Sequence, residues 1–303
     1  MSDQPILFPT DFSECAQSAL THALFHAESL NAPLHVLVAH APGDVPPRWL
    51  SPLEVGSSMD VVMQQRLAEQ LDPHMDRTMN IVQQVSEGES VPLVIRQYAE
   101  EINAAMIVMG THGRRGLQHF LMGSVAEEVV RLAPCPVMTI RSGKKPVHLH
   151  AIRHILCPVD LSPGSAASLR AADWLAERNQ AKITTLHVIE DHQFIGQDAA
   201  RMAPISELIP DLQEKRLTLL KQFCNRHCQN PIDIHCMITV GRAYRRIQEV
   251  VEDLDIDAIA LGTHGWSGFN RLLLGSTAER VIRTATVPVL SIKSKIPWTG
   301  TEH

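Results

Sequence analysis

The chain has 303 residues, of which 45% are hydrophobic, and this is enough for two domains with separate cores. Its formal net charge of −6 argues against binding to nucleic acid or to an anionic membrane surface, because both need a basic face. The N-terminal residues lack the pattern of a signal peptide, and no apolar run approaches the roughly 18 residues of a membrane span. We therefore expect a cytoplasmic protein with no nucleic-acid or membrane partner.

The first half of the chain alternates apolar runs with segments of helical periodicity. The runs at 6–8, 34–41, 80–86, 106–109 and 136–141 predict strands, and the segments at 13–30, 58–77, 90–103 and 124–133 predict helices. A proline-rich loop over 41–57 follows the second strand. Strands that alternate with helices are typical of a parallel sheet covered on both faces.

The second half repeats this order, with strands expected near 155–157, 183–189, 232–239, 258–261 and 288–293. Pro158-Val-Asp160-Leu-Ser162 matches Pro9-Thr-Asp11-Phe-Ser13 of the first half. The predicted fold class is α/β, with two tandem doubly wound, Rossmann-like domains over 1–143 and 152–294. Each is expected to hold a five-stranded parallel sheet of strand order 3-2-1-4-5. The polar stretch 142–150 joins them.

A glycine motif also occurs twice. Gly110-Thr-His-Gly113 is followed by nine residues and then Gly123-Ser124, and Gly262-Thr-His-Gly265 is followed by nine residues and then Gly275-Ser276. Each copy lies between an apolar run and a helical pattern, and exposed N–H groups at such a helix N-terminus bind anions. The motifs therefore predict two phosphate-binding loops. The alternative is that these glycines only turn the chain.

Each of the following helices opens with Ser and Glu three residues apart, namely Ser124 with Glu127 and Ser276 with Glu279. This spacing predicts a capping box, in which the serine is the N-cap and its hydroxyl accepts a backbone N–H. The serines have such a structural role with or without a ligand.

An aspartate follows the first strand of each half. In the order 3-2-1-4-5 the first and fourth strands are neighbours, so we expect Asp11 beside Gly110 and Asp160 beside Gly262. A carboxylate repels phosphate and suits a ribose hydroxyl, an adenine amine or a metal-bound water. The small apolar residues 38–39 and 188–189 suit the flank of a base. Together these features favour a nucleotide over free phosphate.

The motifs Pro-Thr-Asp-Phe-Ser, Leu-His-Val-Ile-Glu at 186–190 and Gly-x2-Gly-x9-Gly-Ser resemble the universal stress protein family, over nearly the whole chain and in both halves. The resemblance implies a tandem, ATP-binding member that takes ATP or another adenine nucleotide, with Mg²⁺ as a further candidate. It implies these nucleotide-binding residues in the first half: Pro9, Thr10, Asp11, Ala39, Met109, Gly110, His112, Gly113, Arg114, Gly123, Ser124 and Val125. In the second half it implies Pro158, Val159, Asp160, Val188, Leu261, Gly262, His264, Gly265, Gly275, Ser276 and Thr277.

Some of these residues have a second interpretation. His112 and His264 either contact phosphate or are satisfied by the loop backbone, and Arg114 either clamps a phosphate or is solvated. Residues 38–40 of the first half read Val-Ala-His, where the family has His-Val-Ile.

The resemblance implies a nucleotide-dependent binding or regulatory module of the stress response. A slow ATPase and a dimerisation scaffold with a vestigial pocket are the alternatives. The sequence contains no Gly-x4-Gly-Lys-Ser/Thr loop and no nucleophile elbow, and it places no paired acid and base near the glycine motifs, which argues against fast catalysis.

The family also implies a partner surface. Its single domains dimerise through the fifth strand, so 136–141 and 288–293 are expected to pair the two halves as an intramolecular pseudo-dimer. A further homodimer through the loop around Trp49 is an additional expectation.

The six cysteines have no spacing typical of a disulfide framework, as expected of reduced thiols inside a cell. Cys224, Cys228 and Cys236 lie near His227 and His235, and all five are potential metal ligands. The interval between the first two cysteines is not a recognised zinc spacing. We therefore interpret them as thiols rather than as a metal centre.

Overall fold

The computed structural model describes residues 4–42, 59–77, 79–113, 122–141, 152–190, 211–230, 232–263 and 274–294. The chain divides into two compact units, Met1–Leu149 and His150–His303, here called domain 1 and domain 2. The predicted interdomain join at 142–150 and most of the proline-rich loop, from 43 onward, lie outside the described residues.

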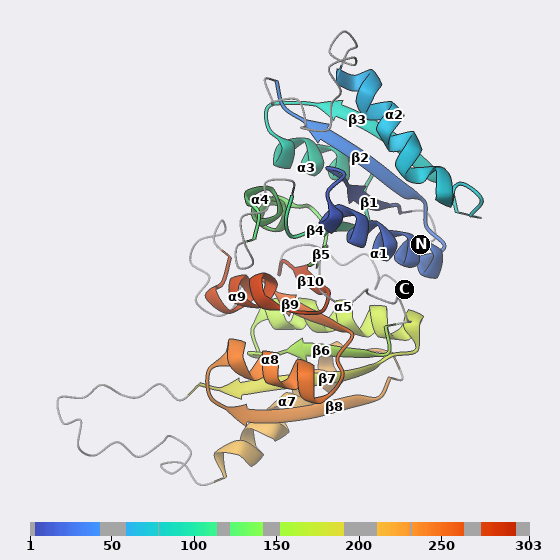
Figure 1. Cartoon of the computed structure of the whole chain (residues 1–303). Coiled ribbons are helices and arrows are strands. Elements are labelled where there is room, and N and C mark those ends of the chain that lie inside the picture. Colours follow the sequence, from blue (N-terminus) through green and yellow to red (C-terminus); the bar gives the residue numbers. More distant parts are fainter. Residues whose placement is uncertain are drawn as a thin grey trace, which may run out of the picture. The chain divides into compact units, whose positions relative to one another are not determined.

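In domain 1, strands and helices alternate along the chain (Figure 1). The elements are β1 (Ile6–Pro9), α1 (Glu14–Leu30), β2 (Leu34–His40), α2 (Met59–Leu71), the 3-10 turn η1 (Asp72–His74), β3 (Ile81–Glu87), α3 (Val91–Glu101), β4 (Met106–Gly110), α4 (Ser124–Leu132) and β5 (Val137–Ile140). All strand pairs in this sheet are parallel, and their order is β3-β2-β1-β4-β5. The predicted order 3-2-1-4-5 is confirmed.

Domain 2 has the same order of elements. They are β6 (His154–Pro158), α5 (Pro163–Asn179), β7 (Lys182–Ile189), α7 (Leu212–His227), β8 (Ile234–Val240), α8 (Ala243–Asp253), β9 (Ala258–Gly262), α9 (Ser276–Thr284) and β10 (Val289–Ile292). Its parallel sheet has the order β10-β9-β6-β7-β8, which is again 3-2-1-4-5 read from the other end. The predicted α/β fold is therefore confirmed in both domains.

Each sheet has helices on both of its faces, as Figure 1 shows within each domain. The central strands consist almost entirely of buried apolar residues, as expected where both faces are covered. The outermost strands β3 and β8 are only half-buried. This arrangement places the carboxyl ends of β1 and β4, and of β6 and β9, side by side at one edge of each sheet.

The second helix of domain 1 is shorter than predicted. The helical pattern at 58–77 suggested one continuous helix, but α2 ends at Leu71 and a 3-10 turn follows. Pro73 lies at the start of that turn, and a proline inside an α-helix removes a backbone donor and clashes with the preceding turn.

Candidate functional site

The aspartate after the first strand is held by a tight turn in both domains. The Ser13 N–H donates to Asp11 Oδ1 at 3.0 Å, and the Ser162 N–H donates to Asp160 Oδ1 at the same distance. The residue after each aspartate has a positive φ, 63° at Phe12 and 64° at Leu161. Positive φ is uncommon outside glycine, so its presence in both copies shows that the turn is a shared feature of the backbone.

In domain 1 the carboxylate of this aspartate lies against the glycine loop. A Cβ atom added to Gly113 would stand 2.7 Å from Asp11 Oδ2, which is closer than real Cβ contacts. The end of β1 and the loop after β4 thus meet at Asp11 and Gly113. In domain 2 the matching residue Gly265 lies outside the described part of the chain, together with His264.

Threonine holds the loop to the start of the following helix. The Thr111 N–H donates to Ile140 O at 2.8 Å, and Thr111 O accepts from the Gly123 N–H at 2.8 Å. In domain 2 the Gly275 N–H donates to Thr263 O at 2.9 Å. A Cβ on Gly123 would lie 3.2 Å from Thr111 O, which is tight, so glycine eases this close approach. The motif spacing alone does not indicate this role for either threonine, although both stand at the same place in the repeated motif.

The predicted capping boxes are wrong. The N-caps are Gly123 in α4 and Gly275 in α9, and Ser124 and Ser276 are the first helical residues. Because the glycine N–H groups bond back to the threonine carbonyls, the chain enters the helix one residue earlier than the Ser-Glu spacing indicates. The two serines are exposed in the first turn, where the helix itself supplies no acceptor for backbone N–H groups. Val125 and Thr277 follow them and are half-buried.

The first glycine of each motif packs against the helix after the first strand. A Cβ on Gly110 would lie 2.8 Å from Cys15 Sγ and 3.1 Å from the Cys15 carbonyl carbon. On Gly262 it would lie 2.7 Å from the carbonyl carbon of Gly164. These glycines allow β4 and β9 to approach α1 and α5, so their first role is close packing.

The remaining predicted residues of domain 1 differ in what they offer a ligand. Thr10 is buried, accepts from the Phe12 N–H at 3.1 Å and donates to Gln70 Oε1 at 3.3 Å, so it stabilises the turn. Pro9 and Met109 are buried strand residues, whereas Ala39 is half-buried at the end of β2. His112 Nδ1 lies 2.8 Å from Thr111 Oγ1. Arg114 lies outside the described residues.

In domain 2 a serine that the motifs did not indicate contacts the aspartate. The Ser165 hydroxyl donates to Asp160 Oδ1, and its oxygen accepts from the Asp160 N–H at 2.9 Å. Helices α1 and α5 have equal length and begin after Ser13 and Ser162, so Ser165 occupies the position of Ala16. Ser165 is three residues after the N-cap Ser162, and the first turn of the helix brings its hydroxyl close to the Asp160 carboxylate.

The base-flanking residues of domain 2 lie beside a buried histidine. Val188 is half-buried near the end of β7. Pro158 is the last residue of β6, and Leu261 is the last residue but one of β9. His187 Nδ1 donates to Val159 O at 2.7 Å. Burial lowers the pKa of His187, which favours the neutral ring. This contact orients the backbone just before Asp160.

Among the residues the structure describes, no group of three or more His, Cys, Asp or Glu side chains is arranged to hold a metal ion. The helices of this described part are also too short or too polar to cross a membrane.

Comparison with known proteins decides the family. A family model described as the universal stress protein family matches residues 4–141 and 151–293. The chain belongs to the universal stress protein family. Because the model matches twice, it is a tandem, two-domain member.

A universal stress protein of Mycobacterium tuberculosis is 25% identical over 312 residues, which cover 96% of this chain and 95% of the relative. The crystal structure of a universal stress protein from Archaeoglobus fulgidus is 20% identical in sequence and has a TM-score of 0.68. The match covers 96% of this chain and 98% of that protein, and it supports the fold. A further universal stress protein from Archaeoglobus fulgidus, whose structure is titled as a complex with dAMP, is 23% identical with a TM-score of 0.35, covering 46% of this chain and 99% of its own.

Proposed function

We propose that this tandem universal stress protein binds an adenine nucleotide, ATP or a relative of it, in each domain. The observation that carries the proposal is the position of the Asp11 carboxylate against Gly113, where a Cβ would stand 2.7 Å from Oδ2, in a glycine loop that leads into a helix N-terminus. One half of this site suits hydroxyl or amine donors, and the other suits an anion. A nucleoside with attached phosphate has both chemistries.

In domain 1, the nucleoside would lie against Asp11 and the end of β2 at Ala39. The phosphates would lie at the first turn of α4, where the backbone N–H groups of Ser124 and Val125 and the helix dipole favour negative charge. Gly113 and Gly123 keep this approach free of side chains. Asp160, Val188, Gly275, Ser276 and Thr277 take the corresponding roles in domain 2.

The part of the site that the structure describes does not supply a full set of metal ligands. Near the described part of the domain 1 loop, Asp11 offers one carboxylate. In nucleotide sites Mg²⁺ is usually held by one or two carboxylates together with phosphate oxygens and water. We therefore propose that Mg²⁺ enters only with a nucleotide that carries several phosphates.

Our proposal for the whole chain is a nucleotide-dependent regulatory module of the stress response, with turnover that is slow at most. We propose domain boundaries at 1–143 and 152–294.

We also propose that the two domains pair through β5 and β10, because each of these strands comes last in the order of its own domain and consists of buried apolar and small residues. Small-angle scattering that shows two independently tumbling lobes would contradict this pairing.

The test of the binding sites is calorimetric titration of the full chain with ATP and AMP. The wild type is expected to bind two equivalents. Gly113→Val places a branched side chain on Asp11 and should remove the domain 1 site, and Asp11→Ala should weaken it by roughly tenfold or more through the loss of charge-assisted hydrogen bonds. Asp160→Ala tests domain 2 in the same way.

Ser18→Ala on the exposed face of α1 is the matched control, because its hydroxyl only donates to Glu14 O within the helix. Circular dichroism shows whether each variant is folded. Unchanged stoichiometry in folded Gly113→Val would reject the domain 1 site.

A further inference from the structure

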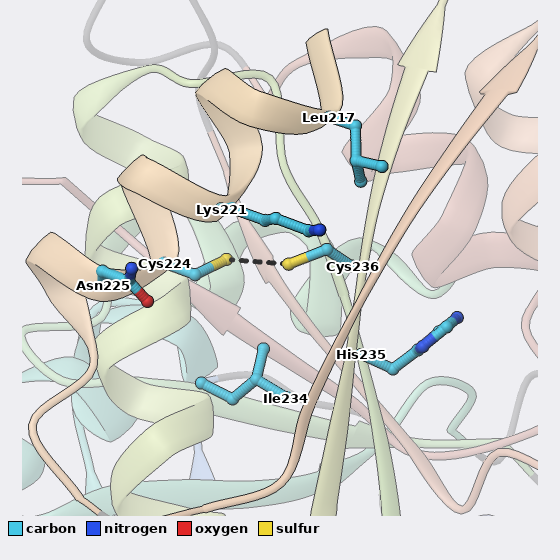
Figure 2. A pocket seen from close by; sticks show the side chains of 7 residues that line it. All are labelled: Leu217, Lys221, Cys224, Asn225, Ile234, His235 and Cys236. Carbon is cyan, nitrogen blue, oxygen red and sulfur yellow. Dashed lines mark hydrogen bonds between the residues drawn. The ribbon is translucent and has the colours of Figure 1, made fainter. Parts of the chain in front are cut away.

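A second chemically distinctive feature lies in domain 2, between α7 and β8 and away from the glycine motif. A pocket of about 500 Å³ opens there, and Figure 2 shows the side chains around it. Its lining residues are Leu217, Lys221, Cys224, Asn225, Ile234, His235 and Cys236. The Sγ atoms of Cys224 and Cys236 lie 3.8 Å apart and point toward each other across it.

The local structure explains why the two sulfurs meet. Helix α7 buries Leu220 and Cys224, which are one turn apart on the face that packs on the sheet. On β8, Cys236 faces this helix, and the neighbouring His235 extends to the other side of the strand in Figure 2, as strand alternation requires. Cys236 is paired in the sheet with Thr185 of β7, and the Cys224 thiol donates to the Thr185 hydroxyl at 3.6 Å.

The two thiols have different environments. Cys224 is 2% exposed, whereas Cys236 is half-buried at the wall of the pocket, so a small reagent reaches Cys236 first. The hydrogen-bonded contact with Cys224 lowers the pKa of Cys236 to about 6, against the opposing effect of burial. The Thr185 hydroxyl and the Lys221 ammonium also lower the pKa of Cys236. The contact between the two thiols raises the pKa of Cys224.

This lowered pKa favours the thiolate form of Cys236, whose sulfur lies 3.8 Å from the Cys224 thiol. Elsewhere in domain 2, burial raises the pKa of Cys157 and of Cys228 to about 12. The thiolate is the nucleophilic form of cysteine, so Cys236 is chemically distinguished from these other thiols of its domain.

We propose that Cys236 and Cys224 form a peroxide-reactive thiol pair, in which Cys236 is the residue modified first and Cys224 resolves the product to a disulfide. The oxidant is a hydroperoxide, ROOH. The Cys236 thiol first releases its proton to water, and its thiolate attacks the terminal peroxide oxygen, so that an S–O bond forms and the O–O bond breaks. The leaving RO⁻ takes up the proton that Cys236 released. The sulfur is oxidised by two electrons and the peroxide is reduced to an alcohol.

In the second step Cys224 loses its proton and its sulfur attacks the sulfenic sulfur of Cys236. The S–S bond forms, the S–O bond breaks, and hydroxide leaves and combines with the released proton as water. The sum is two thiols and ROOH giving one disulfide, ROH and H₂O. A disulfide needs its sulfur atoms about 2.05 Å apart, so the two atoms must approach by roughly 1.8 Å.

Domain 1 does not contain this pair. In the parallel register, Val36 of β2 lies opposite Gln83 of β3, where Thr185 of β7 lies opposite Cys236 of β8. Gln83 has no thiol, so the proposed chemistry belongs to domain 2 and does not depend on the nucleotide sites.

The experiment treats the reduced full chain with hydrogen peroxide at pH 7 and identifies disulfides by peptide mass spectrometry. We expect a Cys224–Cys236 crosslink that dithiothreitol reverses. In Cys224→Ser the sulfenic acid has no resolving thiol, so dimedone should label Cys236. Cys228→Ser is the matched control, and it should leave the crosslink unchanged.

A second measurement needs no variant. Alkylation of the wild type by iodoacetamide should follow a midpoint near pH 6 at Cys236, and at pH 7 it should be at least roughly tenfold faster there than at Cys228. Lys221→Gln should move the midpoint to higher pH. Faster reaction at Cys228, or peroxide treatment that forms no Cys224–Cys236 crosslink, would overturn the proposal.

Discussion

Helices α1 and α5 show what the two domains share and where they differ. Both have 17 residues, both begin after a serine N-cap, and both end with a residue in the left-handed conformation. Yet the position of Ala16 in α1 is occupied by Ser165 in α5, and the positions of His22 and His26 are occupied by Ala171 and Leu175. The backbone of the two copies is therefore preserved more closely than the side chains that surround the aspartate and fill the core.

The largest expected effect concerns the glycines that let the fourth strand approach this helix. Gly262→Ala should destabilise domain 2 by about 1–3 kcal/mol, because its Cβ would meet the Gly164 backbone at 2.7 Å. Gly110→Ala should cost less, because the nearest backbone atom is the Cys15 carbonyl carbon at 3.1 Å, and only the Cys15 Sγ is closer, at 2.8 Å. Hydrogen exchange read on peptides of each domain measures the two effects. Equal destabilisation would contradict this difference between the helices.

A smaller effect separates the domains at acid pH. Burial lowers the pKa of His22 to about 4 and of His26 to about 3, and neither ring has a hydrogen-bond partner among the described residues. The folded state keeps these rings neutral, whereas the unfolded chain takes up protons near pH 6.5. This contribution to stability is therefore complete above about pH 6.5 and is lost as the pH falls toward the folded-state values.

Between pH 6.5 and 5.5 each histidine should lower the free energy of unfolding of domain 1 by about 1 kcal/mol. Replacing them with the domain 2 residues, as His22→Ala and His26→Leu, should remove most of that loss. Hydrogen exchange of domain 1 peptides at the two pH values checks this. A double variant as acid-sensitive as the wild type would show that these rings are not responsible.

The smallest expected effect sharpens the comparison at the aspartate. Ser165→Ala removes the hydroxyl that donates to Asp160 and makes α5 resemble α1, so nucleotide affinity in domain 2 should rise by roughly 0.5–1.5 kcal/mol, or about two- to tenfold. Ala16→Ser should lower the affinity of domain 1 by a similar factor. Calorimetry on variants that retain one working site measures both changes. Opposite signs would mean that the serine helps to orient the carboxylate for its ligand.

The fold of each domain could be predicted from the amino-acid sequence. Alternating apolar runs and helical patterns predicted the parallel sheets, and the repeated motifs at Asp11 and Asp160 located the ends of the first strands. Such predictions succeed because they depend on local periodicity, and because short right-handed crossovers leave few possible strand orders.

The contacts of individual side chains, by contrast, follow from the three-dimensional packing of the elements. The glycine N-caps replaced the predicted serine caps because the carbonyls of Thr111 and Thr263, ten or more residues earlier, bind the glycine N–H groups. Cys224 of α7 and Cys236 of β8 lie close together although a loop separates the two elements along the chain. Contacts of this kind depend on how elements pack in space, and residue spacing along the chain does not encode the distance between them.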